Sequence, residues 1–164
     1  MGMMGVRVDR KRYNLDKLRE GKVRVGWFDD IQYDDGVYVA QVAYWNEYGT
    51  YASPARPFMR PMLHQSQRDI KELLKNSYAR AVRENSDTQR VLMRVGEEVV
   101  WRIQKQILAT TTPPNSPITI NGGWMRNKKS GKPFYVIPKV GTHPLIDTGV
   151  MYQTVSYQVE EVFV

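Results

Sequence analysis

Two amphipathic helical patterns follow one another between residues 63 and 107, and they constrain the fold more than any other feature of the chain. In the second pattern, apolar residues recur every four positions, which places them on one face of a helix. They are Val91, Val95, Val99, Ile103 and Ile107, with Leu92 and Val100 beside them. The first pattern has an apolar face of Leu63, Ile70, Leu73, Leu74, Ser77 and Ala81. Ser86 and Gln89 match the capping box that begins a helix, so the break is short and predicts an antiparallel pair.

The segments on either side of this pair predict short strands. Residues 22–28 alternate polar and apolar side chains, and so do residues 155–162 until two glutamates interrupt the pattern. Residues 118–138 contain two strand-like runs around a turn-rich tip, which predicts a β-hairpin. Short helices are expected after Asn14 and over residues 38–48, the second ending at Gly49. We therefore predict one α+β domain over residues 1–164, with a small antiparallel sheet packed against two long antiparallel helices and a protruding hairpin at 118–138.

The composition argues against several kinds of site. The chain has no cysteine, which excludes disulfides, thiolate metal sites and a cysteine nucleophile. Neither His64 nor His143 has a partner at metal-ligand spacing. No apolar run is long enough to cross a bilayer, and charge begins too early after Met1 for a signal peptide. We therefore expect no cofactor, no metal and no membrane contact.

The positive charge is concentrated in one part of the chain. The net charge is +7, and residues 99–146 contain no acidic side chain. Four of the cations surround the predicted hairpin tip: Arg126, Lys128, Lys129 and Lys132. Such a cluster can contact the DNA backbone or an acidic protein surface, although lysines at hairpin tips are often only solubilising. Trp124 lies beside the tip, where it could stack on a base or simply anchor the hairpin.

The triplet Asp147, Thr148 and Gly149 follows two apolar residues, as the catalytic triplet of a retroviral-type aspartic protease does. That enzyme needs a flap and a substrate-covering sheet after the triplet, and only 15 residues follow it here. We therefore favour a structural role, in which Asp147 caps a turn or a short helix over residues 148–152.

Residues 54–61, with the sequence PARPFMRP, hold three prolines and predict an irregular segment. Pro61 is well placed to begin the next helix. Because proline restricts the backbone, Phe58 and the arginines on either side lose little entropy on docking to a partner. The alternative interpretation is a crossing between helices with Phe58 in the core.

Three segments, in this order, resemble the minor tail proteins of long-tailed bacteriophages, of the tail-completion or head–tail joining kind. They are residues 43–50 (AYWNEYGT), 54–61 (PARPFMRP) and 144–149 (PLIDTG). Those proteins typically have a helix ending in Asn-Glu-aromatic-Gly-Thr, a Pro-x-Arg-Pro-Phe segment, two long helices and a Pro-Leu-x-Asp-Thr-Gly turn before a closing strand. The resemblance covers about residues 22–160, although residues 118–138 are longer than the usual connection in that family.

The resemblance implies a structural virion protein, not an enzyme, which completes the tail or joins it to the head as a ring that is often sixfold. It implies a location in the tail or neck, after assembly in the host cytoplasm. The implied partners are other copies of the chain, the tail tube, the tail terminator and the head connector, with genomic DNA in the channel as a further possible contact. On this basis Arg56, Pro57, Phe58 and Arg60 hold a subunit or neighbour contact, while Asp147, Thr148 and Gly149 shape the turn before the last strand. The alternative is a DNA-binding packaging protein without sequence preference, which the basic charge motivates.

Overall fold

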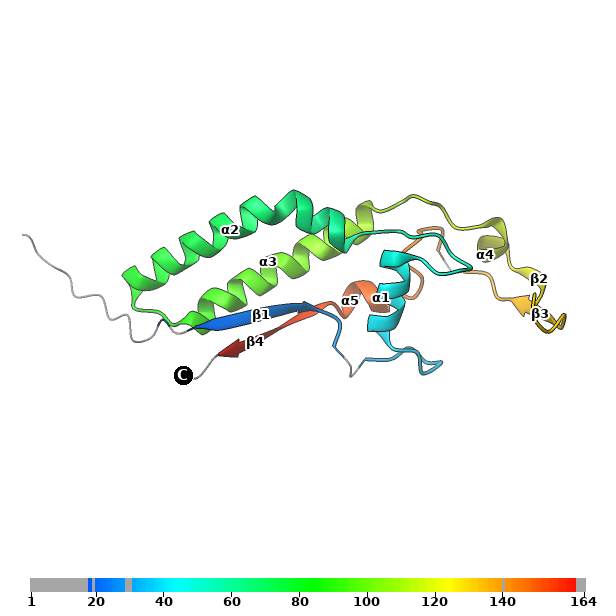
Figure 1. The fold of residues 1–164 in the computed structure, drawn as a ribbon, viewed down its shortest axis with the longest axis horizontal. Helices are drawn as coiled ribbons and strands as arrows, with labels where there is room; N and C mark the ends of the chain where they lie inside the picture. The colour runs from blue at the N-terminus through cyan, green and yellow to red at the C-terminus, as the bar shows by residue number, and fades with distance from the viewer. Residues whose placement is uncertain (1–17, 19, 29–30, 140, 162–164) are drawn as a thin grey trace, which may run out of the picture.

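Helix α3 (Thr88–Ala109) is the central element of the fold, and the other long elements pack along it (Figure 1). The computed structural model describes residues 18, 20–28, 31–139 and 141–161. Helix α2 (Met59–Glu84) runs antiparallel on one side of α3, and strands β1 (Gly21–Gly26) and β4 (Ser156–Glu161) lie on the other. The class is α+β, as predicted. The expected helix after Asn14 falls largely outside the described residues.

The helix pair forms because each apolar stripe finds a partner. All five positions of the predicted four-residue repeat in α3 are buried, and Ile103 and Ile107 are almost completely enclosed. Helix α2 ends at Glu84, and the left-handed backbone of its C-cap residue, Asn85, turns the chain back toward α3. The predicted cap at Ser86 is wrong by one residue. The N-cap is Asp87, because its side chain accepts the Arg90 N–H at 2.9 Å.

Strands β1 and β4 form a two-stranded antiparallel sheet, in register from Gly21 opposite Glu161 to Gly26 opposite Ser156. Val23 and Val25 pack against the core. On the polar side, Glu160 forms ion pairs with Lys22 at 2.8 Å and with Arg24. Both predicted strands are therefore confirmed, with slightly shorter bounds.

Gly96 explains how β4 approaches α3 so closely. A Cβ atom at this position would lie 2.6 Å from Cγ and 3.0 Å from Cβ of Tyr157. These atoms lie near the strand backbone, so they cannot move aside as the end of a flexible side chain can. A glycine inside a helix costs stability, and here it makes room for the sheet.

Shorter elements occupy the other end of the molecule (Figure 1). Helix α1 (Val39–Tyr48) agrees with the prediction, and helix α5 (Val150–Gln153) precedes β4. A separate hairpin of β2 (Gly123–Arg126) and β3 (Pro133–Val136) projects from this end. No helix in the described ranges is both long and apolar enough to cross a membrane.

The predicted hairpin over 118–138 is too long, because its first predicted strand is a helix. Residues 118–120 belong to α4 (Pro117–Asn121). Pro117 is at the start of this helix, where its missing N–H is not needed, and the Thr119 and Ile120 N–H groups both donate to the Ser116 carbonyl. The strands are therefore limited to residues 123–126 and 133–136.

We predict that Gly96→Ala destabilises the protein although alanine favours helix. Overpacking should lower the free energy of unfolding by roughly 1–3 kcal/mol, and the gain in helix propensity offsets at most about 1 kcal/mol of this. Chemical denaturation measures the difference. Gln89→Ala, at an exposed position of the same helix, is the control and should change stability little. An unchanged or more stable Gly96→Ala protein would contradict the close contact with Tyr157.

Candidate functional site

A cleft of about 580 Å³ opens between α1, the loop that follows it, the proline-rich loop after α3 and the loop before α5. Its lining includes residues from all three segments that carry the resemblance. These are Trp45 and Asn46 from the first, Pro54 and Arg56 from the second, and Pro144, Leu145, Asp147, Thr148 and Gly149 from the third. Segments that lie about 100 residues apart in the sequence therefore meet at one cleft.

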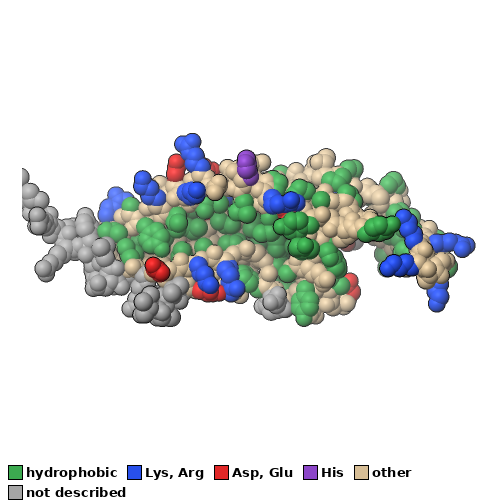
Figure 2. Space-filling model, in the orientation of Figure 1, with side chains coloured by type: hydrophobic (Ala, Val, Ile, Leu, Met, Phe, Trp, Pro, Cys, Tyr) green, Lys and Arg blue, Asp and Glu red, His purple; other side chains and the backbone are tan. Residues whose placement is uncertain are grey.

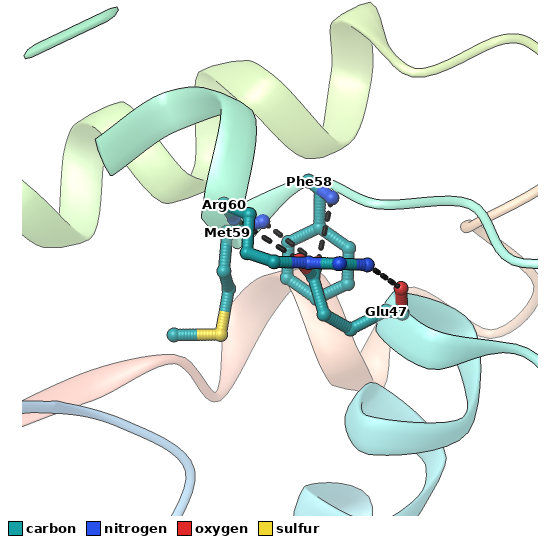
Figure 3. Close-up of polar contacts among 4 residues, drawn as sticks. All are labelled: Glu47, Phe58, Met59 and Arg60. Carbon is teal, nitrogen blue, oxygen red and sulfur yellow. Dashed lines mark hydrogen bonds and ion pairs between the residues drawn. The ribbon is translucent and has the colours of Figure 1, made fainter. Parts of the chain in front are cut away.

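A single carboxylate, that of Glu47, joins α1 to α2 (Figure 3). Its Oε2 accepts the N–H groups of Phe58 at 2.7 Å and Met59 at 2.9 Å. Its Oε1 accepts both the backbone N–H of Arg60 at 3.0 Å and the Arg60 Nε at 2.8 Å. The first amide groups of α2 are thus capped by a residue of another helix, and the negative charge sits where the helix dipole favours it.

Glu47 is only 4% exposed, so the state of its carboxyl group matters for stability. Burial by itself would raise the pKa of Glu47. The hydrogen bonds from the Phe58 N–H, the Arg60 side chain and the Met59 and Arg60 N–H groups outweigh burial, and the pKa is lowered. The site therefore favours the charged carboxylate at neutral pH.

The Arg60 side chain, which donates to the buried Glu47 carboxylate, is itself 56% exposed to solvent. It also donates from Nη2 to the Glu47 carbonyl at 2.8 Å, and its guanidinium lies 4.7 Å from the centre of the Tyr48 ring. Tyr48 in turn packs on Tyr44, with ring centres 4.8 Å apart. These exposed aromatic rings and the arginine form one surface across α1 and the start of α2.

Arg56 ties the second segment to the proline-rich loop. Its Nε donates to the Pro113 carbonyl at 2.8 Å, and its Nη2 donates to the Pro114 carbonyl at 3.1 Å. Asn115 continues the connection, because its amide donates to the Thr142 carbonyl at 3.3 Å. Arg56 is only 8% exposed, and burial lowers its pKa without removing its charge in the physiological range.

Lys139 holds the third segment in a similar way. Its Nζ donates to the carbonyls of His143 at 3.1 Å and Pro144 at 3.2 Å. Burial lowers the pKa of Lys139; the Asp147 carboxylate opposes this shift, and the positive charge of Arg56 adds to it. Arg56, which is buried, and Lys139, which is partly buried, thus hold the loops that form the cleft through backbone carbonyls.

The structure places the predicted contact residues in different environments. Phe58 is fully buried and packs edge-on against Trp27, with ring centres 5.7 Å apart. The alternative interpretation, a crossing with Phe58 in the core, is therefore the arrangement observed. Since Phe58 and Arg56 are enclosed by their own chain, neither side chain is exposed to meet a partner. For Pro57 and Arg60 the contact stays a prediction. Pro61 does not begin α2, which starts two residues earlier under the Glu47 cap.

The triplet Asp147, Thr148 and Gly149 forms a turn before α5, with one correction. The predicted cap was Asp147, but Gly149 occupies the N-cap position, with φ at 81°. The hydroxyl of Thr148 accepts the Val150 N–H at 3.4 Å, so the helix begins at Val150. The Trp27 indole donates to the Met151 carbonyl at 2.8 Å and holds this short helix against the core.

The β2–β3 hairpin, called the arm below, is the most exposed part of the described chain. Trp124 is 72% exposed although it packs edge-on against Tyr135, with ring centres 5.5 Å apart. The four predicted cations are all exposed at or beside the tip, and Figure 2 shows Lys and Arg side chains gathered at this end. The Asn127 side chain shapes the tip by accepting the N–H groups of Lys129 and Ser130.

Sequence reasoning missed the roles of Glu47 and Lys139. A signal for Glu47 was present, because a glutamate in the last turn of a helix is disfavoured by the helix dipole and needs another reason to be there. No comparable signal marks Lys139, because its partners are backbone carbonyls.

In comparisons with known proteins, no family model, curated protein or solved structure matches the chain. Within the part of the chain that the structure describes, no group of three or more His, Cys, Asp or Glu side chains is placed to hold a metal ion.

We predict that Glu47→Gln destabilises the protein at neutral pH by roughly 2–4 kcal/mol, because the amide would direct N–H groups at the N–H donors of α2. The lowered pKa also sets the sign of the pH effect. The contribution of Glu47 is complete above the ordinary glutamate pKa and is lost as the pH falls from there through the lowered value.

Urea denaturation from neutral to acidic pH tests both parts. The variant should lose stability less steeply toward acid than the parent protein does. Glu72→Gln is the matched control, because Glu72 makes an exposed ion pair with Arg68 at 3.3 Å. Equal effects from the two substitutions would contradict the special role of Glu47.

Proposed function

We propose that this chain is a structural protein of a long-tailed bacteriophage virion, which completes the tail or joins it to the head as part of a ring at the neck. The observation that carries the proposal is the meeting of the three resembling segments at one cleft. Segments that are distant in the sequence but share one surface are expected where a partner binds. The proposal locates the protein in the virion, after assembly in the host cytoplasm.

The chemistry of the cleft supports a structural role over a catalytic one. Glu47 and Arg56 are buried and Lys139 is partly buried, and each makes most of its hydrogen bonds with backbone groups. Groups used in this way fix shape. In this proposal the chain carries out no reaction and needs no cofactor.

The exposed surfaces support association with other chains. Large aromatic side chains are exposed on α1 and the following loop, namely Tyr44, Tyr48 and Tyr51, and again on the arm. Tyrosine and tryptophan with a neighbouring arginine are the residue types enriched in binding hot spots. The proposed partners are other copies of the chain, the tail tube, the tail terminator and the head connector, with channel DNA as a further contact for the arm tip.

We expect an amber mutation of this gene, in the phage genome that encodes it, to yield heads and tails that fail to join. Electron microscopy of lysates grown in suppressing and non-suppressing hosts measures this. A suppressor host that inserts the native residue at the amber codon is the control and should yield complete particles. Complete, infectious particles without the chain would overturn the proposal.

A second candidate function, DNA binding without sequence preference, is favoured by one observation. The arm holds four exposed cations at or beside its tip, together with an exposed tryptophan, and residues 99–146 contain no acidic side chain. If the tip contacts several phosphates, duplex binding should weaken steeply as salt rises, and Lys129→Glu with Lys132→Glu should reduce the slope. A fluorescence-anisotropy titration decides this. The control is Lys71→Glu with Lys75→Glu on the exposed side of α2, which should leave the slope unchanged. If the parent protein does not bind duplex DNA at moderate salt, DNA binding is excluded as the function.

A further inference from the structure

The arm has an apolar side chain pair on each of its two faces. Trp124 lies opposite Tyr135 in the strand register, and Met125 lies opposite Phe134. Adjacent pairs along a hairpin point to opposite faces, and all four side chains are exposed. A two-stranded hairpin is only marginally stable by itself, and exposed apolar patches mark binding surfaces. The major groove of duplex DNA admits a two-stranded ribbon but presents mainly polar base edges and phosphates, so apolar side chains on both faces fit a slot in a protein better.

The charge of the arm specifies what the end of the slot must provide. The tip carries Lys128, Lys129 and Lys132, and the flanking residues 99–146 contain no acidic side chain. A complementary slot therefore combines apolar walls with carboxylates where the tip arrives.

The cleft of this same chain has both features. Its walls include the apolar side chains of Val37, Trp45, Pro54 and Leu145. One wall comes from the loop over residues 33–37, which exposes Asp34 and Asp35. Two cations also line the cleft. Arg56 is 8% exposed and Lys139 is partly buried, and both donate to backbone carbonyls, which reduces the positive charge that they present at the surface.

The arm does not fill the cleft of its own chain. None of residues 123–138 lines the cleft, and the arm projects away from the body of the molecule (Figures 1 and 2). Its one described side-chain contact with the α1–α2 loop joins Lys128 Nζ to the Tyr51 ring, 5.9 Å from the ring centre. The arm and the cleft of one chain are therefore both open to a second copy.

We propose that the arm of one copy docks in the cleft of the next copy, with its apolar faces between the cleft walls and its lysines near Asp34 and Asp35. The two surfaces differ, so each copy uses its arm on one neighbour and its cleft on another. Such head-to-tail contacts close into a ring or continue as a filament. The inference rests on the proposed function for its biological setting, since it names the contact that builds the neck ring.

Cysteine cross-linking tests the contact in the full-length protein, because the natural chain has no cysteine to give a background. One batch carries Ser130→Cys at the arm tip, and a second, tagged batch carries Ser53→Cys at the edge of the cleft. A bifunctional maleimide should link the mixed batches into one-to-one dimers and should link neither batch to itself. Dimers within the Ser130→Cys batch, or no dimers in the mixture at high protein concentration, would overturn the inference.

Charge reversal shows whether the expected complementarity holds the contact. Lys129→Glu with Lys132→Glu in the arm batch should lower the cross-linked yield at least about tenfold. Mixing this charge-reversed arm batch with a cleft batch that carries Asp34→Lys and Asp35→Asn should restore the cross-linked yield. The asparagine keeps the side-chain oxygen that accepts the Val37 N–H. Lys71→Glu with Lys75→Glu in the arm batch is the matched control and should leave the yield unchanged. Equal loss in the control, or no restoration, would contradict the arrangement.

The outcomes separate this inference from the proposed function. If the arm variants abolish duplex binding and no cross-link forms, the arm contacts DNA and the inference fails while the neck role stands. If complete particles form without the chain, the neck role fails while a cross-link between copies still supports the arm-to-cleft contact.

Discussion

The carboxylate of Glu47 is the constraint on which the cleft end of the molecule depends. It is buried, charged and hydrogen-bonded to the amide groups of Phe58, Met59 and Arg60, which are the N-cap and the first two residues of α2, so it fixes where α2 begins relative to α1. Moving such a group into solvent or leaving its donors unpaired would cost several times the free energy of an exposed ion pair. The loop between the two helices is thereby held at both ends, and it forms one wall of the cleft.

Backbone geometry at this loop follows from the same constraint. Gly49 ends α1 with φ at 78°, and a Cβ atom there would lie 2.8 Å from the Ala55 nitrogen. The chain folds back so tightly that the Arg56 N–H donates to the Asn46 carbonyl at 2.7 Å. Arg56 then reaches the proline-rich loop. A cap, a glycine and a buried arginine together explain why the first two resembling segments occur in this order and at this spacing.

The sequence predicted the long elements well and the short ones less well. The stripe from Val91 to Ile107 is long enough that only a helix buries it, and the strands at 21–26 and 156–161 alternate clearly. The strand predicted at residues 118–120 was wrong. Three β-branched residues after a proline are compatible with a strand or with a short helix, and the hydrogen bonds to the Ser116 carbonyl stabilise the helix. The candidate contact at Phe58 was partly misjudged, because a rigid backbone says nothing about which way a side chain faces.

The sequence by itself determined the α+β class, the antiparallel helix pair, the absence of cysteine chemistry and the uneven positive charge. These are properties of local periodicity and composition, which every window of the chain carries. Only the tertiary structure decided that Glu47 caps a distant helix, that three separated segments share one cleft and that the arm is apolar on both faces yet uncovered. Each of these depends on contacts between residues far apart in the chain, and no local pattern records which of the possible partners is met.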